Sequence, residues 1–285
     1  MHEFFSKIGI VSNKDGQQRT LNELIEILDA RKIKYLLDDR YLPKNFQNPH
    51  IVPRKNWDSD LDLALIIGGD GTFLSAGREL YSRNIPLLGI NRGHLGFLAD
   101  INADNLESEF NAILDGEYIC ENRQLLAVEV ERQGAIVAKF RAVNELVIHL
   151  RAAARMVELD TYNSGEFLCK YRADGLIIST PTGSTAYALS AGASIISPTV
   201  KAFLIVPICP HTLSHRPVIL DFHSEIMVIP RSDTDMQISV DGQEEFLLSE
   251  GDKIHAFYGG DLRVLHPKNY SFQDRLREKL NWGIL

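Results

Sequence analysis

A glycine-rich turn directly follows a short apolar run in this sequence. Leu63 to Ile67 has the length and branching of a buried strand, Gly68-Gly69-Asp70-Gly71 follows it, and a helix-like segment begins at Thr72. Glycines let the backbone approach a ligand closely, and the N–H groups at a helix start attract anions, so the arrangement can bind phosphate. A carboxylate there repels phosphate unless it binds a metal or accepts a proton. Asp70 is a candidate for either role, although a tight turn with Asp70 capping the helix explains the same residues.

Two further patterns could recognise a nucleotide. Asn144 and Glu145 place an amide beside a carboxylate at the start of a predicted strand, and together they can bind vicinal ribose hydroxyls. The hydroxyl-rich loop Pro181 to Tyr187 leads into a predicted helix and offers a ring that can stack on a base. Polar residues also occur on ordinary strand edges, and Thr182 or Ser184 can simply cap the helix. The residues alone leave these explanations open.

Basic residues gather in one part of an otherwise acidic chain. They are Arg151, Arg155, Lys170 and Arg172. Charge-assisted hydrogen bonds from such a cluster favour a pyrophosphate, while a solvated hairpin face explains the same residues without a ligand. Asp241-Gly242-Gln243 is most simply a hairpin turn between Val240 and Phe246, and a ligand contact is the alternative.

Composition excludes several classes of protein. The 285 residues are 45% hydrophobic, which is enough for one large domain or two. A net charge of −8 argues against general binding to nucleic acid or membrane surfaces, and no apolar run has the length of a membrane span. The three cysteines lie far apart without a CxxC pair, which indicates reduced thiols and a cytoplasmic protein. We therefore expect no nucleic-acid partner and no membrane partner.

The first part of the chain alternates buried strands with helices. Strands are predicted at 7–13, 33–37, 63–67 and 86–91, with helices at about 17–31 and from Thr72 to about Tyr81. This pattern predicts an α/β domain with a parallel, Rossmann-like sheet over residues 1–100. Ligands bind at the carboxyl ends of such strands, where Gly68 to Gly71 and Asn91 to His94 lie.

The pattern changes near Asp100. After a short helix at about 105–115, many strand-like segments follow with Gly and Pro between them, which predicts an all-β, sandwich-like domain over 101–265. One helix near Ser184 interrupts it. The tail 266–285 contains a predicted helix from Ser271 to Leu280 that can pack back on the first domain.

The order of the motifs is more specific than any one of them. The chain has no GxxxxGK[ST] loop and no GxGxxG after its first strand. GGDGTFL, GINRGHLGFL, NE, RADGLIISTPTGSTAYALSAG, PHTLSHRPVI and DGQ follow one another between Ile66 and Gln243. This order resembles the bacterial NAD kinase family, whose members use ATP or polyphosphate and belong to the GGDGT kinase superfamily. GGDGT alone is shared with diacylglycerol and sphingoid-base kinases.

The resemblance implies a reaction and a set of site residues. It implies phosphorylation of the 2′-hydroxyl of the adenosine ribose of NAD by ATP, giving NADP and ADP, with Asp70 as general base and Gly71 at the substrate. The family's other NAD contacts correspond to Asn144, Glu145, Arg155, Arg172, Asp174, Thr185, Ala186, Tyr187, Ala188, Leu189, Ser190 and Gln243. It also implies a divalent metal, Mg²⁺, and a homo-oligomer, either a dimer or a tetramer.

Two alternatives belong to other functional classes. A lipid kinase shares GGDGT but needs access to a membrane, and this acidic chain shows neither a basic amphipathic helix nor an apolar anchor. A non-catalytic dinucleotide sensor would bind phosphate better without the carboxylate of Asp70.

Overall fold

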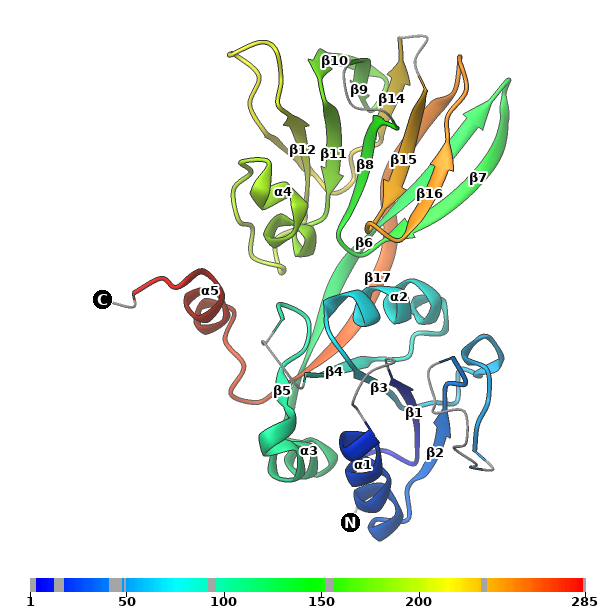
Figure 1. Cartoon of the computed structure of the whole chain (residues 1–285), viewed down its shortest axis with the longest axis vertical. Helices are drawn as coiled ribbons and strands as arrows, with labels where there is room; N and C mark the ends of the chain where they lie inside the picture. Colours follow the sequence, from blue (N-terminus) through cyan, green and yellow to red (C-terminus); the bar gives the residue numbers. More distant parts are fainter. Residues whose placement is uncertain are drawn as a thin grey trace. The chain divides into compact units, whose positions relative to one another are not determined.

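The computed structural model describes residues 4–12, 18–40, 48, 50–91, 96–151, 156–231 and 235–283. It divides into two compact units: unit 1 is Met1–Asn122 with Leu262–Leu285, and unit 2 is Arg123–Asp261. The chain enters unit 2 within strand β6 (Tyr118–Arg132) and returns within β17 (Lys253–Pro267) (Figure 1). The sequence predicts a different division into domains, which stays a prediction: residues 1–100 with 266–285 form one domain, and residues 101–265 form the other.

Unit 1 alternates strands with helices. Its strands are β1 (Lys7–Ser12), β2 (Lys34–Leu37), β3 (Leu63–Ile67), β4 (Leu87–Asn91) and β5 (Ile101–Asn102). Its helices are α1 (Gln18–Ala30), α2 (Asp70–Leu80), α3 (Leu106–Leu114) and α5 (Phe272–Leu280), with 3₁₀ turns at Arg54–Asn56, Tyr81–Arg83 and Ala103–Asn105. The strands pair in parallel in the order β2-β1-β3-β4, so their carboxyl ends lie at the same edge.

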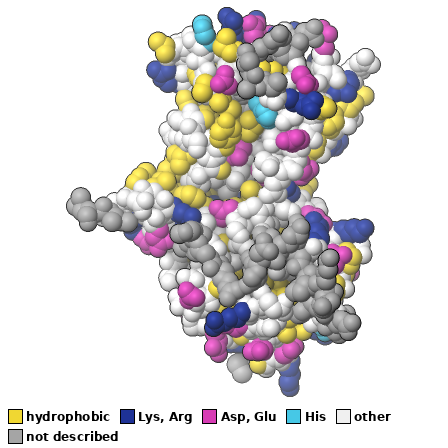
Figure 2. All heavy atoms as spheres, in the orientation of Figure 1, with side chains coloured by type: hydrophobic (Ala, Val, Ile, Leu, Met, Phe, Trp, Pro, Cys, Tyr) yellow, Lys and Arg dark blue, Asp and Glu magenta, His cyan; other side chains and the backbone are white. Residues whose placement is uncertain are grey.

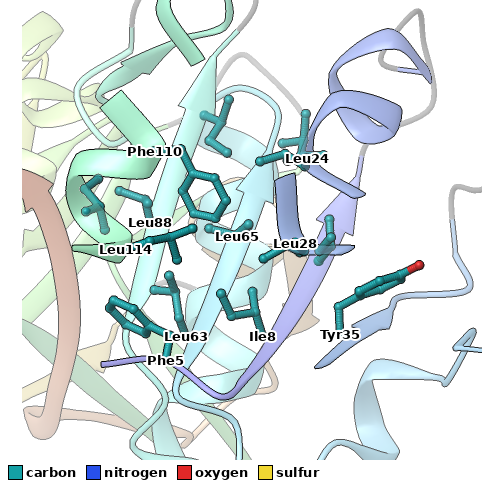
Figure 3. Close-up of a cluster of buried hydrophobic side chains, with 14 of the residues drawn as sticks. Phe5, Ile8, Leu24, Leu28, Tyr35, Leu63, Leu65, Leu88, Phe110 and Leu114 are labelled. Atoms are coloured by element: carbon teal, nitrogen blue, oxygen red, sulfur yellow. The ribbon is translucent and has the colours of Figure 1, made fainter. Parts of the chain in front are cut away.

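Helices cover both faces of this sheet. Apolar residues at helical spacing on α1, such as Leu24 and Leu28, pack with Phe110 of α3 against Ile8 and Leu65 of the sheet (Figure 3). Figure 1 shows α2 on the opposite face. A parallel sheet covered on both faces needs strands that are buried throughout, which explains the unbroken apolar run of β3.

The carboxyl-terminal segment belongs to unit 1. Ser271 caps α5 by accepting a hydrogen bond from the Asp274 amide at 3.2 Å. Arg275 of this helix donates to Oδ1 of Asp100 at 2.9 Å, and His266 contacts Oδ2 of the same carboxylate at 2.5 Å. These buried charged contacts attach the tail to the segment that follows β4.

Unit 2 is built mainly from antiparallel strands. Besides its parts of β6 and β17 they are β7 (Ala135–Ala142), β8 (Glu145–Leu150), β9 (Val157–Asn163), β10 (Glu166–Ala173), β11 (Gly175–Ser179), β12 (Ala202–Ile208), β13 (Val218–Asp221), β14 (Ile226–Pro230), β15 (Met236–Val240) and β16 (Glu244–Leu247). A 3₁₀ turn (Thr182–Thr185) and helix α4 (Tyr187–Ser190) follow β11. One sheet has the order β13-β12-β11-β8-β15-β16, and β10-β9-β14-β17 with the β6–β7 hairpin forms the other.

An apolar core lies between the two sheets of unit 2. Leu146 and Ile148 of β8 point into this core and meet residues of the other sheet such as Val128 and Leu159. Because side chains alternate along a strand, Glu145, Val147 and His149 point to the opposite face of β8. That outer face holds the polar residues of interest.

The predicted fold class is confirmed: an α/β unit with a parallel sheet is combined with an all-β, sandwich-like unit. Two strands are much longer than their sequence patterns predict. The strand expected over 125–131 is β6, which begins at Tyr118, and the strand expected over 253–257 is β17, which continues to Pro267. Polar residues such as Glu121 and the exposed Asn122 interrupt the apolar pattern in the first part of β6, so the pattern does not indicate a strand there. The helix predicted near Ser184 is a 3₁₀ turn followed by the single turn of α4.

Surface features agree with the composition. On the face drawn in Figure 2, basic and acidic side chains lie among one another, as expected for a chain with a net charge of −8. Within the described part of the chain, each helix is too short or too polar to span a bilayer.

Candidate functional site

Asp70 is the first residue of α2 and lies immediately after the glycines that end β3. Gly69 is the N-cap residue in an extended conformation. The Asp70 carboxylate accepts hydrogen bonds from the backbone N–H groups of Phe97, at 3.0 Å, and Leu98, at 3.1 Å. The side chain is thus held by the backbone segment that follows β4. Two adjacent parallel strands, β3 and β4, therefore fix the direction of one carboxylate.

Gly96 permits this position of Asp70. A Cβ on Gly96 would lie 1.9 Å from Oδ1 of Asp70, so any larger residue must displace the carboxylate or the backbone. Gly68 is similarly restricted, because a Cβ there would lie 2.6 Å from Oγ1 of Thr72.

The resemblance implies that Asp70 is the general base. On that expectation Gly96→Ala should lower kcat strongly while the protein stays folded, because the methyl group moves the Asp70 carboxylate and catalysis depends on positions within about 1 Å. Steady-state kinetics with circular dichroism measures both effects. A double-mutant cycle with Asp70→Asn is the control: the double variant should lose no more than Asp70→Asn alone, since both changes act through one carboxylate. Additive losses, or an unchanged kcat in Gly96→Ala, would show that Gly96 does not act through Asp70.

In unit 2, the predicted Asn144–Glu145 pair is held by an aspartate. The carboxylate of Asp241 accepts three consecutive backbone N–H groups: Val143 at 3.0 Å, Asn144 at 2.8 Å and Glu145 at 3.1 Å. The backbone N–H of Asp241 in turn donates to the carbonyl of Glu145 at 2.9 Å. This network fixes the backbone at the start of β8.

The Pro181–Tyr187 loop packs against the same turn. The Thr180 N–H donates to the Asn144 carbonyl at 2.9 Å, and the Thr180 hydroxyl donates to the Val143 carbonyl at 2.6 Å. A Cβ on Gly183 would lie 2.3 Å from the Asn144 carbonyl oxygen, so only glycine fits this contact. The Ser184 hydroxyl bonds to backbone groups of Pro181 and Ile196, which makes it a structural residue of the loop. Two motifs far apart in the sequence therefore form one hydrogen-bonded unit.

A cavity of about 1210 Å³ opens on the outer face of the β8–β11–β15 sheet, next to this unit. Its volume exceeds that of most sites for drug-sized ligands, so it can hold a dinucleotide. The residues that line it are Glu145, Val147, His149, Leu150, Arg151, Met156, Asp174, Tyr187, Ile208, Cys209, Ser239, Asp241 and Gly242.

Glu145 is the unusual group of this cavity. It is only 6% exposed, and its Oε2 has no hydrogen-bond partner among the described residues. Burial, and then the negative charge of Asp241, raise the pKa of Glu145 to about 8. A largely buried carboxyl with a raised pKa in the wall of a cavity is a typical ligand-binding group.

The structure brings some of the predicted site residues together. Glu145, Asp174 and Tyr187 line the cavity. The backbone N–H of Asn144 donates to Asp241, which also lines it. Ala188 is fully buried in an apolar cluster that includes Val147 of the cavity wall, and its contact with NAD stays a prediction. The other predicted contacts on this loop and turn, which are Thr185, Ala186, Leu189, Ser190 and Gln243, do not line the cavity and stay predictions.

The basic cluster is largely engaged in ion pairs. Glu158 pairs with two of these residues: its Oε1 lies 3.1 Å from Nε of Arg172, and its Oε2 lies 3.7 Å from Nζ of Lys170. Nη1 of Arg151 lies 3.3 Å from Oδ2 of Asp235. Only Arg151 of these lines the cavity. Arg155, and likewise residues 92–94 after β4, lie outside the described residues.

Sequence reasoning missed several lining residues. His149 and Ser239 lie on the outer faces of β8 and β15, and Cys209 follows β12. The position of His149 could have been predicted from strand periodicity. It lies two residues after Val147 and four after Glu145, so the three side chains share one face of the strand. Asp241 was assigned to a hairpin turn, with a ligand contact as the alternative, and its hydrogen bonds to residues 143–145 depend on the pairing of β15 with β8.

The resemblance implies Mg²⁺, and the donors present suit an ion that substrate phosphates would largely hold. Among the described residues, no three His, Cys, Asp or Glu side chains come together as metal ligands. In phosphoryl transfer, Mg²⁺ is typically held by one or two carboxylates and by the substrate phosphates, and Asp70 offers one such carboxylate.

Comparisons with known proteins agree with this geometry. Residues 8–118 match the family model of the ATP-NAD kinase N-terminal domain, and residues 143–261 match the ATP-NAD kinase C-terminal domain. An NAD kinase of Pseudomonas putida (strain W619) is 42% identical over 289 residues, which cover 99% of this chain and 97% of that protein. An NAD kinase of Ectopseudomonas mendocina (strain ymp) is 41% identical over 294 residues, with the same coverage of both chains.

Two solved structures share the fold. Yeast NADH kinase complexed with NADH has a TM-score of 0.85 and 28% identity, covering 98% of this chain and 88% of the yeast chain. An NAD kinase from Archaeoglobus fulgidus in complex with ATP has a TM-score of 0.71 and 23% identity, covering 96% of this chain and 97% of that chain. With near full-length relatives above 40% identity, this chain belongs to the NAD kinase family.

Proposed function

We propose that this protein transfers the γ-phosphoryl group of ATP to the 2′-hydroxyl of the adenosine ribose of NAD, giving NADP and ADP. The observation that carries the proposal is the Asp70 carboxylate, which two backbone N–H groups hold at the start of α2. The near full-length relatives named NAD kinase support the reaction, and the NADH in the yeast structure supports a nicotinamide dinucleotide as substrate.

Asp70 acts as the general base in this proposal. A ribose hydroxyl is a poor nucleophile, and a carboxylate is too weak a base to remove its proton in advance. The proton therefore passes to Asp70 while the 2′-oxygen bonds to the γ-phosphorus and the bond to ADP breaks. The glycine turn and the first N–H groups of α2 stabilise phosphate charge, so positioning and electrostatics supply much of the rate.

The cavity of unit 2 binds the dinucleotide. The buried Glu145 and the adjacent Asn144 amide provide donors and acceptors for ribose hydroxyls, and the exposed ring of Tyr187 offers a stacking surface at the cavity wall. The remaining predicted contacts, Gly71, Arg155, Arg172, Asp174, Thr185 to Ser190 and Gln243, belong to the same proposal.

Mg²⁺ is the divalent metal in this proposal, and it neutralises phosphate charge when it is bound with ATP. Asp70 can alternatively serve as a ligand of that ion. We also propose that the protein acts in the cytoplasm as a homo-oligomer. The three cysteines are free, which suits a reducing compartment, and exposed apolar side chains such as Leu213 and Phe167 offer contact area between copies.

A coupled assay tests the reaction. The purified protein, incubated with NAD, ATP and Mg²⁺, should generate a dinucleotide that an NADP-specific dehydrogenase reduces, and it should not phosphorylate diacylglycerol in vesicles. Phosphorylated lipid without NADP would favour the lipid kinase alternative. NAD binding by calorimetry without any NADP would favour the sensor.

A further inference from the structure

The backbone at Asp241 directs its side chain toward the start of β8. Asp241 has φ of 50°, in the left-handed region that aspartate and asparagine tolerate better than most residues, and it begins the turn between β15 and β16. It is 7% exposed, and both oxygens accept backbone N–H groups from Val143 to Glu145. The carboxylate is therefore an internal anchor as well as part of the cavity wall.

Glu145 lies beside this anchor, and the described residues provide no cation to compensate its charge. In the described part of the chain, no Lys or Arg forms an ion pair with it, and the Arg151 side chain that lines the same cavity pairs with Asp235. An ionised Glu145 would be a buried charge next to the charge of Asp241, which is costly unless one of the two groups takes up a proton. Burial, and then the charge of Asp241, raise the pKa of Glu145, so Glu145 is the group that keeps the proton.

The other titratable and charged groups around the cavity come from separate elements. His149 and Arg151 come from β8 and its end, Asp174 precedes β11, Cys209 follows β12, and Tyr187 begins α4. The His149 Nδ1 lies 2.8 Å from the Leu150 carbonyl, so that nitrogen carries the proton and the ring already has a donor role within the chain. Asp241 remains the group whose charge acts on Glu145.

We propose that Asp241 is a positioning residue that fixes the Asn144–Glu145 backbone and keeps Glu145 as a neutral acid, whose O–H donates a hydrogen bond to NAD. The inference deepens the proposed function and rests on it. A neutral carboxyl has one donor and one acceptor oxygen, which complements ribose hydroxyls, whereas an ionised one only accepts. It also adds no negative charge beside the pyrophosphate of the dinucleotide.

The pH dependence of NAD binding tests the proposal. In the free protein the acid loses its proton above about pH 8, the value to which burial and Asp241 raise the pKa of Glu145. If binding requires the proton, the Kd for NAD should be flat below that pH and rise about tenfold per pH unit above it. Calorimetry from pH 6 to pH 9.5 without ATP measures this directly.

Glu145→Gln removes the titrating proton but keeps the shape of the side chain. Glutamine keeps a donor and an acceptor and does not titrate in this range, so the rise above pH 8 should disappear. At pH 7 this variant should bind NAD much better than Glu145→Ala. Cys209→Ser should keep the inflection, which excludes the thiol of the same cavity, and Glu245→Gln, at an exposed carboxylate of β16, serves as the charge control.

Asp241→Asn tests the positioning role. Asparagine removes the negative charge that favours protonated Glu145, so the inflection should move to lower pH as well as the affinity falling. A merely structural role would weaken binding equally at every pH.

The inference is overturned if wild-type affinity is flat to pH 9.5, or if Glu145→Gln binds as poorly at pH 7 as Glu145→Ala. Because these are binding measurements, NADP formation with a flat pH profile overturns only this inference, whereas binding without NADP formation overturns the proposed reaction.

Discussion

Replacing Asp70 with asparagine should lower kcat about 10²–10⁴-fold, the range typical for loss of a positioned general base. Asparagine has nearly the same shape but cannot accept the proton of the ribose hydroxyl. NAD affinity should change little, because the residues that line the cavity all belong to unit 2. Steady-state kinetics and calorimetry measure the two quantities.

Two controls sharpen this experiment. Asp104→Asn, at an exposed carboxylate of unit 1, should leave kcat unchanged. The dependence of the Asp70→Asn rate on Mg²⁺ concentration distinguishes a base from a metal ligand, because loss of a ligand weakens Mg²⁺ binding and excess metal then restores part of the rate. A variant with intact turnover and abolished NAD binding would show that Asp70 is a binding residue instead.

Gly183→Ala should have the second large effect, on both stability and NAD binding. The added methyl group would lie 2.3 Å from the Asn144 carbonyl oxygen and 2.5 Å from the Ser179 hydroxyl, so the loop must move away from the start of β8. Overpacking of this kind costs about 1–3 kcal/mol. The melting temperature should fall by several degrees, and the KM for NAD should rise about tenfold or more as the Asn144–Glu145 pair shifts.

Thermal unfolding and kinetics at several NAD concentrations check this expectation. Gly134→Asn is the matched control, because it changes a glycine of unit 2 at the β6–β7 turn where a Cβ meets nothing within 4 Å, and asparagine tolerates its φ of 80°. An unchanged KM with a lowered melting temperature would mean that the loop stabilises unit 2 without positioning the NAD-binding pair.

The sequence predicted best what local patterns determine. The strand of Leu63 to Ile67, the glycine turn and the helix after it were predicted almost to the residue, because apolar runs and glycines report local conformation. The N–H donors of Asp70 could not be predicted, since Phe97 and Leu98 reach it only through the pairing of β3 with β4.

The role of Asp241 shows the same limit in unit 2. From sequence, Asp241-Gly242 is a hairpin turn, and the structure does place it at the β15–β16 turn. Its contact with residues nearly a hundred positions earlier depends on antiparallel pairing of β15 with β8. The surroundings of Ala188 depend on pairing in the same way, because its apolar cluster joins α4 to Val147 of β8 and Ile177 of β11. A motif locates a site, but sheet pairing decides which side chains face it.

The most direct test of the account is the chemical identity of the product. ³¹P NMR of the reaction of wild-type protein with NAD, ATP and Mg²⁺ should show one phosphomonoester on the 2′-oxygen of the adenosine ribose for each ADP formed. The same reaction with Asp70→Asn should show almost none. ADP without phosphorylated NAD, or phosphate on another hydroxyl, would contradict the proposed reaction and the role of Asp70 in it.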